Sequence, residues 1–85
     1  MTYRVTYTDE ARRGIGSLAP DQRRAVIDAE RDVLASRPYE AGIEFEGRGP
    51  NALRRLVLDK ARVSIGYRVF PDRVEVTVVW LIGHP

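Results

Sequence analysis

The 85-residue sequence has no cysteine, which excludes a disulfide framework and any chemistry that needs a thiolate. It has one histidine and no cluster of residues with metal-ligand spacing, so neither a metal nor another cofactor is expected. No apolar run approaches the roughly 20 residues that a membrane span needs, and the first residues run into a strand pattern rather than a signal peptide. These absences indicate a cytoplasmic protein without a membrane partner. The length indicates one domain, residues 1–85, with a small core.

The sequence also has little net charge, only +2 at pH 7, but its basic residues are unevenly distributed. Between Gly47 and Arg68 there is a single acid, Asp59, against six basic residues: Arg48, Arg54, Arg55, Lys60, Arg62 and Arg68. A local excess of positive charge of this kind favours polyanions as partners.

The stretch from Leu53 to Gly83 alternates between apolar and polar residues and is rich in β-branched and aromatic side chains. It contains two turn signals, Asp59-Lys60 and Pro71-Asp72, so it predicts three successive antiparallel strands. With a two-residue connection at the second turn, the paired positions are Phe70 with Arg73, Arg68 with Glu75, Gly66 with Thr77, Ser64 with Val79 and Arg62 with Leu81.

This register gives the predicted sheet two different faces. One face is almost wholly apolar and needs a cover; it collects Val63, Ile65, Tyr67, Val69, Val74, Val76, Val78, Trp80 and Ile82. Tyr67 and Trp80 are therefore expected in the core rather than as platforms for stacked bases. The other face is left to meet a partner and holds Arg62, Ser64, Arg68, Glu75 and Thr77. On it, a cross-strand salt bridge is expected between Arg68 and Glu75.

The first part of the chain predicts one strand and two helices. Residues 3–7 alternate and form the strand, and Thr8 is a suitable N-cap for a short helix that follows. A second helix runs over about 20–36, because Pro20 suits a first turn and an Arg-Pro pair ends the pattern. Its apolar stripe is Val26, Ile27, Ala29, Val33 and Leu34.

The segment of residues 38–52 is rich in glycine and proline and is expected to be a connection, anchored by Ile43 and Phe45. The element order is then β-α-α-β-β-β, which indicates an α+β domain. In this prediction two helices pack on one face of a four-stranded, mainly antiparallel sheet, and the first strand lies beside the last.

Several short motifs follow one another along the chain in a definite order. They are Tyr7-Thr8-Asp9-Glu10-Ala11, Leu18-Ala19-Pro20, Leu53-Arg54-Arg55-Leu56, Arg62-Val63, and the closing stretch from Arg73-Val74-Glu75-Val76 to Leu81-Ile82-Gly83-His84. The ordered set resembles the RelE/ParE superfamily of toxins from bacterial toxin–antitoxin systems. The motifs are similar to its first strand and helix start, its helix–helix elbow, two middle strands, and a last strand with a Gly-His ending. No single motif is specific, but the set covers nearly the whole chain.

The resemblance implies a function for the basic residues and the histidine. Members of the mRNA-cleaving branch cut mRNA in the ribosomal decoding site, where a 2′-OH attacks the adjacent phosphate. Carried onto this sequence, the implied catalytic residues are Arg55, Arg62 and His84, and the further candidates for binding RNA or phosphate are Arg48, Lys60 and Arg68. Arg48 and Lys60 are also ordinary loop and turn residues. The sequence departs from the family pattern at Pro85, where many relatives have arginine, and it lacks the tail that often carries a tyrosine.

The strand pattern agrees with this assignment in part. Pairing Arg62 with Leu81 brings His84 close to Arg62. An even-numbered loop in the first hairpin puts Arg55 on the same face. Arg54 then points to the opposite face, where it is expected to lie over helix edges or to pair with an acid. Guanidinium groups can bind a phosphate and stabilise developing charge, and a histidine can exchange a proton near neutral pH.

Two other functions stay open. The first is a ParE-like inhibitor of DNA gyrase, which binds its target and has no catalytic residues of its own. The second is a catalytically inactive family member that acts only as an antitoxin partner or DNA-bound co-repressor. For the endonuclease, the resemblance implies a cognate antitoxin, the ribosome and mRNA as partners. It also allows a toxin–antitoxin hetero-oligomer that binds operator DNA.

Overall fold

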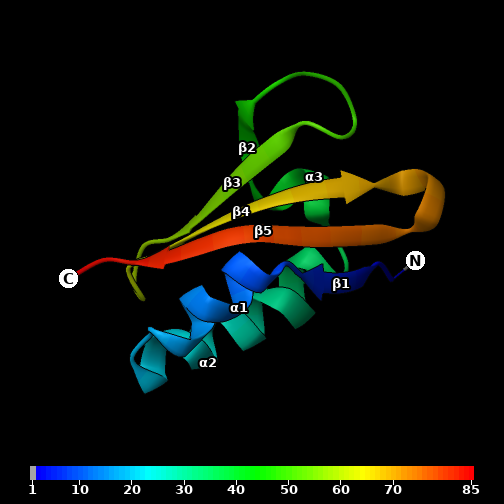
Figure 1. The fold of residues 1–85 in the computed structure, drawn as a ribbon. Helices are drawn as coiled ribbons and strands as arrows, with labels where there is room; N and C mark the ends of the chain where they lie inside the picture. Colours follow the sequence, from blue (N-terminus) through cyan, green and yellow to red (C-terminus); the bar gives the residue numbers. More distant parts are fainter. Residues whose placement is uncertain (1) are drawn as a thin grey trace.

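A computed structural model describes residues 2–85 and arranges them as a sheet with helices across one face (Figure 1). In chain order the elements are β1 (Arg4–Tyr7), α1 (Asp9–Gly16), α2 (Pro20–Ala29), the π-helical turn η1 (Glu30–Leu34), α3 (Pro38–Ala41), β2 (Ile43–Glu46), β3 (Leu53–Leu58), β4 (Val63–Phe70), the 3-10 turn η2 (Pro71–Arg73) and β5 (Glu75–Gly83). The α+β class and the order of the predicted elements are confirmed. Two elements, α3 and β2, are added within residues 38–52.

The sheet has five strands in the order β1-β5-β4-β3-β2. β1 runs parallel to β5 and all other neighbours are antiparallel, so the prediction that the first strand lies beside the last is confirmed. The predicted number of four strands is too low by one, because β2 forms where a connection was expected. Its sequence Ile-Glu-Phe-Glu does alternate, but it is only four residues long and lies between two glycines.

Ile43 and Phe45 are not core anchors, because they are 64% and 49% exposed. By the strand register, Ile43 lies on the sheet face away from the helices. The segment is held instead by Pro38 and Ala52, which are buried. The carbonyl of Pro38 accepts a hydrogen bond of 2.6 Å from the hydroxyl of the buried Tyr67.

The helix starts follow from the sequence. Helix α1 is capped by Thr8, whose Oγ1 accepts a hydrogen bond of 3.1 Å from the Ala11 N–H. Helix α2 begins at Pro20 and the helical segment continues through η1, which agrees with the helix predicted over 20–36. No helix among residues 2–85 is long and apolar enough to cross a membrane.

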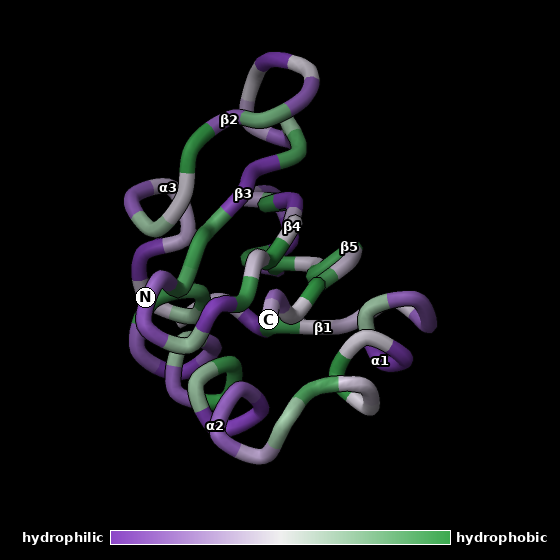
Figure 2. The backbone as a smooth tube through the Cα atoms, turned by 90° about the vertical axis from the view of Figure 1, so that its left-hand side faces the viewer, coloured by the Kyte–Doolittle hydropathy of each residue, from purple (hydrophilic) through white to green (hydrophobic). Residues whose placement is uncertain are grey.

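The apolar stripe of the second helical segment is confirmed except at one position. Its buried members are Val26, Ala29 and Leu34, and Val33 packs against them half-buried. Ile27 is 58% exposed, because it lies about 100° around the helix from Val26 and faces away from the sheet. Figure 2 shows the resulting alternation of hydrophilic and hydrophobic residues along α2.

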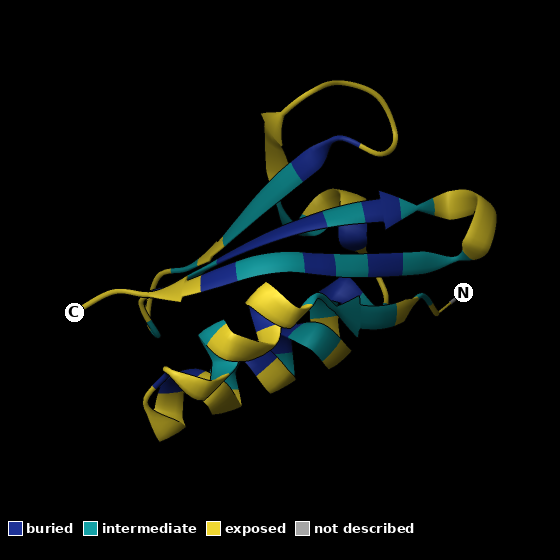
Figure 3. Cartoon of the chain, viewed as in Figure 1, coloured by how far each residue is buried: buried dark blue, intermediate teal, exposed yellow. Residues whose placement is uncertain are grey.

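The core lies between the helices and the face of the sheet that they cover (Figure 3). β4 and β5 supply most of it: Val63, Ile65, Tyr67, Val69, Val76, Val78 and Leu81. Ala11 and Leu34 pack onto these strands from the helical side. Val76 and Val78 have no exposed surface, which confirms that they belong to the core. We call the opposite face, which no described helix covers, the open face.

The connection between β4 and β5 is longer than predicted. It comprises residues 71–74, so Phe70 pairs with Glu75 rather than with Arg73. Val74 was expected in the sheet, but it closes this turn with a left-handed φ of 49°. A shift of two residues moves every predicted pair but leaves each side chain on its predicted face.

A β-bulge in β5 then changes the faces. Adjacent β4 residues pair with Val78 and Trp80, which leaves Val79 outside the ladder. One extra residue reverses the alternation of side chains beyond it. Leu81 therefore joins the core. Trp80 and Ile82 lie on the open face, so their predicted place in the core is wrong.

The residue that caps α1 also holds the bulge. The Thr8 hydroxyl donates a hydrogen bond of 2.6 Å to the Val79 carbonyl. The Thr8 backbone N–H donates another, of 3.0 Å, to the Val78 carbonyl. Because the same Oγ1 accepts from the start of α1, one side chain fixes the helix against the irregular point of the strand.

Replacing Thr8 with alanine should lower the free energy of unfolding by about 1–3 kcal/mol, since it removes the cap and leaves the Val79 carbonyl without its donor. Urea denaturation measures the change. Thr8→Ser keeps the hydroxyl and is the matched control, with an expected loss of about 1 kcal/mol or less for the missing methyl group. Equal stability of the two variants would contradict the double role of the hydroxyl.

Candidate functional site

Three residues lie together at the end of β5, beside the open face: Arg62, Ser64 and His84, which we call the terminal cluster. The His84 backbone N–H donates a hydrogen bond of 2.7 Å to the Arg62 carbonyl. The Nε2 of His84 lies 3.0 Å from the Oγ of Ser64. The predicted closeness of Arg62 and His84 is confirmed, but through another register, in which Val63 pairs with Gly83.

Arg55 lies on the same open face, opposite Gly66. The loop between β3 and β4 has four residues, 59–62. Because this number is even, Arg55 lies on the open face, as predicted. Gly66 is two residues along β4 from Ser64, a distance of about 7 Å. The Arg55 guanidinium is 4.9 Å from the centre of the Phe45 ring. Its Nε is buried without a hydrogen-bond partner among the described residues.

Gln22 ties helix α2 to the terminal cluster. Its amide nitrogen lies within hydrogen-bond distance of three carbonyl oxygens: those of Ala61 at 3.0 Å, Arg62 at 3.2 Å and His84 at 3.4 Å. Its Oε1 accepts a hydrogen bond of 3.1 Å from the N–H of Ala19, the residue before the first turn of α2. Gln22 is only 8% exposed. It was not among the predicted residues, although a polar residue four positions before Val26, on the buried stripe, is a readable signal.

The backbone of Arg62 has an uncommon conformation. Its φ of 59° lies in the left-handed region, which is unfavourable for a residue with a branched or long side chain. The Arg62 N–H donates a hydrogen bond of 2.8 Å to the Leu58 carbonyl and closes the loop. The hydrogen bonds to Gln22 and His84 therefore hold a strained position at the site.

The other predicted phosphate-binding residues are not gathered at the terminal cluster. Arg68 lies on the open face, but its Nη1 donates a hydrogen bond of 3.0 Å to the Asn51 carbonyl. Arg48 is exposed in the loop between β2 and β3. Lys60 is exposed in the turn after β3, where it lines a cavity beside α2.

The predicted salt bridge between Arg68 and Glu75 is wrong. The longer connection after β4 places Arg68 opposite Thr77 instead. Glu75 pairs with Arg4, with 2.7 Å between Nη2 and Oε1, and this hydrogen bond lowers the pKa of the carboxyl group.

Arg54 points to the helix side of the sheet, as its place next to Arg55 requires. Its Nη2 donates hydrogen bonds to the carbonyls of Tyr39 at 2.7 Å and Gly42 at 2.6 Å. The guanidinium is also 5.5 Å from the centre of the Tyr39 ring. These carbonyls belong to α3 and its C-terminal end, so the prediction that Arg54 lies over a helix edge is confirmed. Its hydrogen bonds go to carbonyl groups rather than to an acid.

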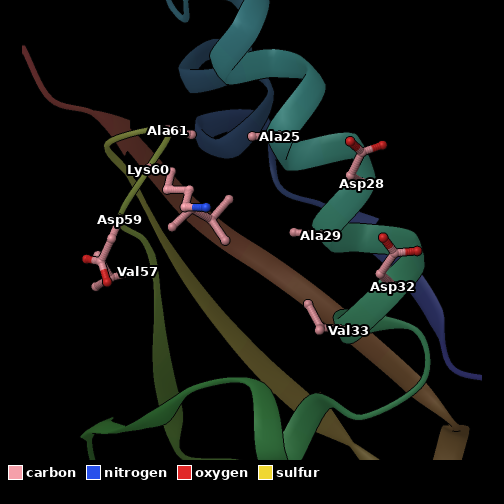
Figure 4. Close-up of a pocket in the computed structure, with 10 residues that line it drawn as sticks. Ala25, Asp28, Ala29, Asp32, Val33, Val57, Asp59, Lys60 and Ala61 are labelled. Atoms are coloured by element: carbon pink, nitrogen blue, oxygen red, sulfur yellow. The ribbon is translucent and has the colours of Figure 1, made fainter.

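A cavity of about 580 Å³ lies on the helix side of the β3–β4 loop (Figure 4). It is lined by Ala25, Asp28, Ala29, Asp32, Val33, Val57, Leu58, Asp59, Lys60 and Ala61. A second hollow of about 490 Å³ reaches His84 from the side of α1 and includes Gln22 in its lining. No group of three or more histidine or acidic residues within 2–85 is placed to hold a metal ion.

The open face combines guanidinium groups with an imidazole. Guanidinium groups bind phosphate oxygens through paired hydrogen bonds, and an imidazole can give or take a proton near neutral pH. Arg62 and His84 are both exposed, so a ligand can approach them from solvent. The geometry therefore suits a phosphodiester better than an uncharged ligand.

The sequence matches no family model and no curated protein. The structure is nevertheless similar to solved RelE toxins. With the RelBE2 toxin–antitoxin complex from Mycobacterium tuberculosis the TM-score is 0.81 at 20% identity, over 99% of this chain and 93% of that one. With the archaeal RelE–RelB complex from Pyrococcus horikoshii OT3 the TM-score is 0.78 at 25% identity, over 98% of this chain and 96% of that one. With the isolated E. coli RelE toxin the TM-score is 0.78 at 19% identity, over 98% of this chain and 85% of that one. The fold implied by the motifs is thus confirmed.

Replacing Gln22 with alanine should lower the free energy of unfolding by about 1–3 kcal/mol, because buried carbonyls lose their donor. The His84 amide should exchange with solvent about tenfold faster or more, since its segment is no longer tied to α2. Hydrogen exchange followed by NMR measures this. Arg23→Ala, a change at the adjacent exposed position, is the control. An unchanged His84 exchange rate in Gln22→Ala would contradict the positioning role.

Proposed function

We propose that the protein is the toxin of a type II toxin–antitoxin system and arrests translation as an endoribonuclease that cuts ribosome-bound mRNA in the cytoplasm. The observation that carries this proposal is the backbone hydrogen bond from His84 to Arg62, which brings two exposed side chains to the end of the sheet, with Arg55 on the open face nearby. The fold shared with RelE toxins of bacterial and archaeal origin supports it.

In the proposed reaction the 2′-OH of one nucleotide attacks the adjacent phosphorus, and the bond from that phosphorus to the 5′-oxygen of the next nucleotide breaks. The 2′-OH loses a proton and the leaving 5′-oxygen gains one, so the products are a 2′,3′-cyclic phosphate and a 5′-hydroxyl. Arg55 and Arg62 hold the phosphate and stabilise the charge of the pentacoordinate transition state. His84 exchanges a proton with the 2′-OH or the 5′-oxygen. The step as written uses no metal.

The contact between His84 Nε2 and Ser64 Oγ fits this role, because it orients the imidazole on the open face. Arg68 supplies a further positive charge on the same face for the RNA backbone. Arg48 and Lys60 are exposed and serve as outlying phosphate contacts in this proposal.

Replacing Arg62 with alanine should reduce the cleavage rate about 100- to 1000-fold. Other enzymes lose about this much when one preorganised hydrogen-bond donor to the developing charge is removed. His84→Ala should reduce it about 100-fold or more, the usual loss for a general acid or base. Both variants should fold, because both residues are exposed. Primer extension on programmed ribosomes with purified protein measures the cuts, and Arg23→Ala should cleave at the full rate.

Full cleavage by Arg62→Ala would contradict the catalytic assignment. If mRNA stays intact while the unchanged protein still stops growth, a DNA gyrase supercoiling assay tests the ParE-like alternative. If the protein does neither, it is an inactive binding partner of an antitoxin.

We further propose a cognate antitoxin as partner, with one segment seated in the 580 Å³ cavity beside α2. Several of the similar structures are complexes of a RelE toxin with its antitoxin, which supports an antitoxin. Within the described residues, 56–58 of β3 pair with β4 only, so one backbone edge beside the cavity can accept another strand. Asp28 and Asp32 at the cavity already pair with Arg24 and Arg31, so the apolar lining from Ala25, Ala29 and Val33 is the surface that such a segment would contact.

Co-expression with the neighbouring small gene should give a complex that copurifies and abolishes toxicity. Ala25→Arg should weaken this complex about tenfold or more, because it fills the cavity with a long charged side chain. Ser36→Arg adds the same side chain at an exposed site outside the cavity lining and should bind normally. Isothermal titration calorimetry measures both. Equal affinities would place the antitoxin elsewhere.

A further inference from the structure

Trp80 is a large aromatic residue on the face of the sheet that no described helix covers. The bulge at Val79 puts it there, opposite Gly66 of β4. A Cβ atom at position 66 would lie 2.5 Å from Nε1 and 2.6 Å from Cζ2 of Trp80, so the indole lies directly on the strand backbone and only glycine leaves it room. Trp80 is half-buried, so part of the ring stays accessible from the open face.

Phe45 extends this surface. Its ring meets that of Trp80 edge to face, with 6.2 Å between centres and an interplanar angle of 71°. Phe45 is 49% exposed, which is unfavourable for a phenyl ring without a ligand. The Arg55 guanidinium lies 4.9 Å from its centre, and the buried Arg55 Nε has no partner among the described residues. The three side chains form one surface, which we call the aromatic platform.

The platform adjoins the terminal cluster. Along β4, Gly66 beneath Trp80 is two residues from Ser64, which contacts His84. This separation of about 7 Å lets neighbouring parts of one extended ligand reach both places. A molecule that binds the cluster through a phosphate can therefore lay an adjoining flat group on the platform.

The charge of β3, β4 and β5 favours RNA over protein as this ligand. β3 and β4 together carry three arginines, Arg54, Arg55 and Arg68, and no acid. β5 carries no acid after Glu75, which is already paired with Arg4. The edge strand β2, which carries Phe45, adds Glu44 opposite Arg54 and Glu46 opposite Leu53. Aromatic rings beside cations are the surface on which single-stranded nucleic acids stack their bases.

We propose that Trp80 and Phe45 form a stacking platform for a nucleobase of single-stranded RNA, next to the phosphate held at the terminal cluster. The inference rests on the proposed function and adds to it the residues that position the substrate. Stacking accepts every base, because each has a π-face, so the platform selects unpaired RNA rather than a sequence. Arg55 has two parts in this site, as a wall of the platform and as a phosphate ligand.

The first test uses the protein's own fluorescence, because Trp80 is the only tryptophan. His84→Ala protein, chosen to leave RNA uncut, is titrated with a short single-stranded RNA, with the same length of abasic sugar–phosphate chain, and with duplex RNA. The single strand should quench Trp80, and the abasic chain and the duplex should not. Equal quenching by the abasic chain would overturn the proposal, because no base is then needed.

The second test compares two exposed aromatic residues that each carry an arginine over the ring. Phe45→Leu removes the platform's edge on the open face. Tyr39→Leu removes the ring beside Arg54 on the helix side and is the matched control. Phe45→Leu should weaken RNA binding about 10- to 100-fold and raise KM for programmed ribosomes with little change in kcat. Tyr39→Leu should change neither.

The outcomes separate this inference from the proposed function. If the protein cuts mRNA but Phe45→Leu and Tyr39→Leu have the same KM, cleavage stands and the platform is overturned. If the protein cuts nothing but single-stranded RNA quenches Trp80 and Phe45→Leu abolishes this, the platform stands without the enzyme. If Phe45→Leu weakens only the antitoxin complex, the surface is a protein contact and the inference is overturned.

Discussion

The hydrogen bond from the Thr8 hydroxyl to the Val79 carbonyl is the interaction on which the arrangement of the sheet depends. It joins the start of α1 to the one residue of β5 that has left the ladder. Because a bulge reverses the alternation of side chains, this point decides that Leu81 enters the core. The same point decides that Trp80 lies on the open face. One threonine thus fixes the point at which the two faces of β5 change over.

A second tie runs from the helices to the site. Gln22 is buried among apolar neighbours of α2, and it uses its amide on the carbonyls around Arg62 and His84. A buried amide is stable only when its hydrogen bonds are made, so the helix layer and the terminal cluster support each other. This explains how a loop residue with a left-handed φ stays in place at the end of the sheet.

The two faces of the sheet differ in which side chains they can accept. This difference fits the combination of low sequence identity and high structural similarity. On the helix side any apolar side chain of suitable volume fills the core, so the fold persists at about one identical residue in five. On the open face chemistry decides, and there the chain has arginines, aromatic rings and one histidine. The shared fold does not by itself show a shared mode of action, which depends on those residues of the open face.

Local pattern was enough to predict the layers, the strand order and the burial of Val76 and Val78, because period-two and period-3.6 repeats report directly which side of an element is apolar. It was also enough to bring Arg62 beside His84. It did not predict β2, whose four residues are too few to stand out between glycines. Nor did it predict the side of Trp80. A bulge is made by hydrogen bonds from a distant helix cap, and an alternating sequence carries no mark of the residue at which the alternation reverses. That reversal, and with it the character of the open face, was decided by the tertiary structure alone.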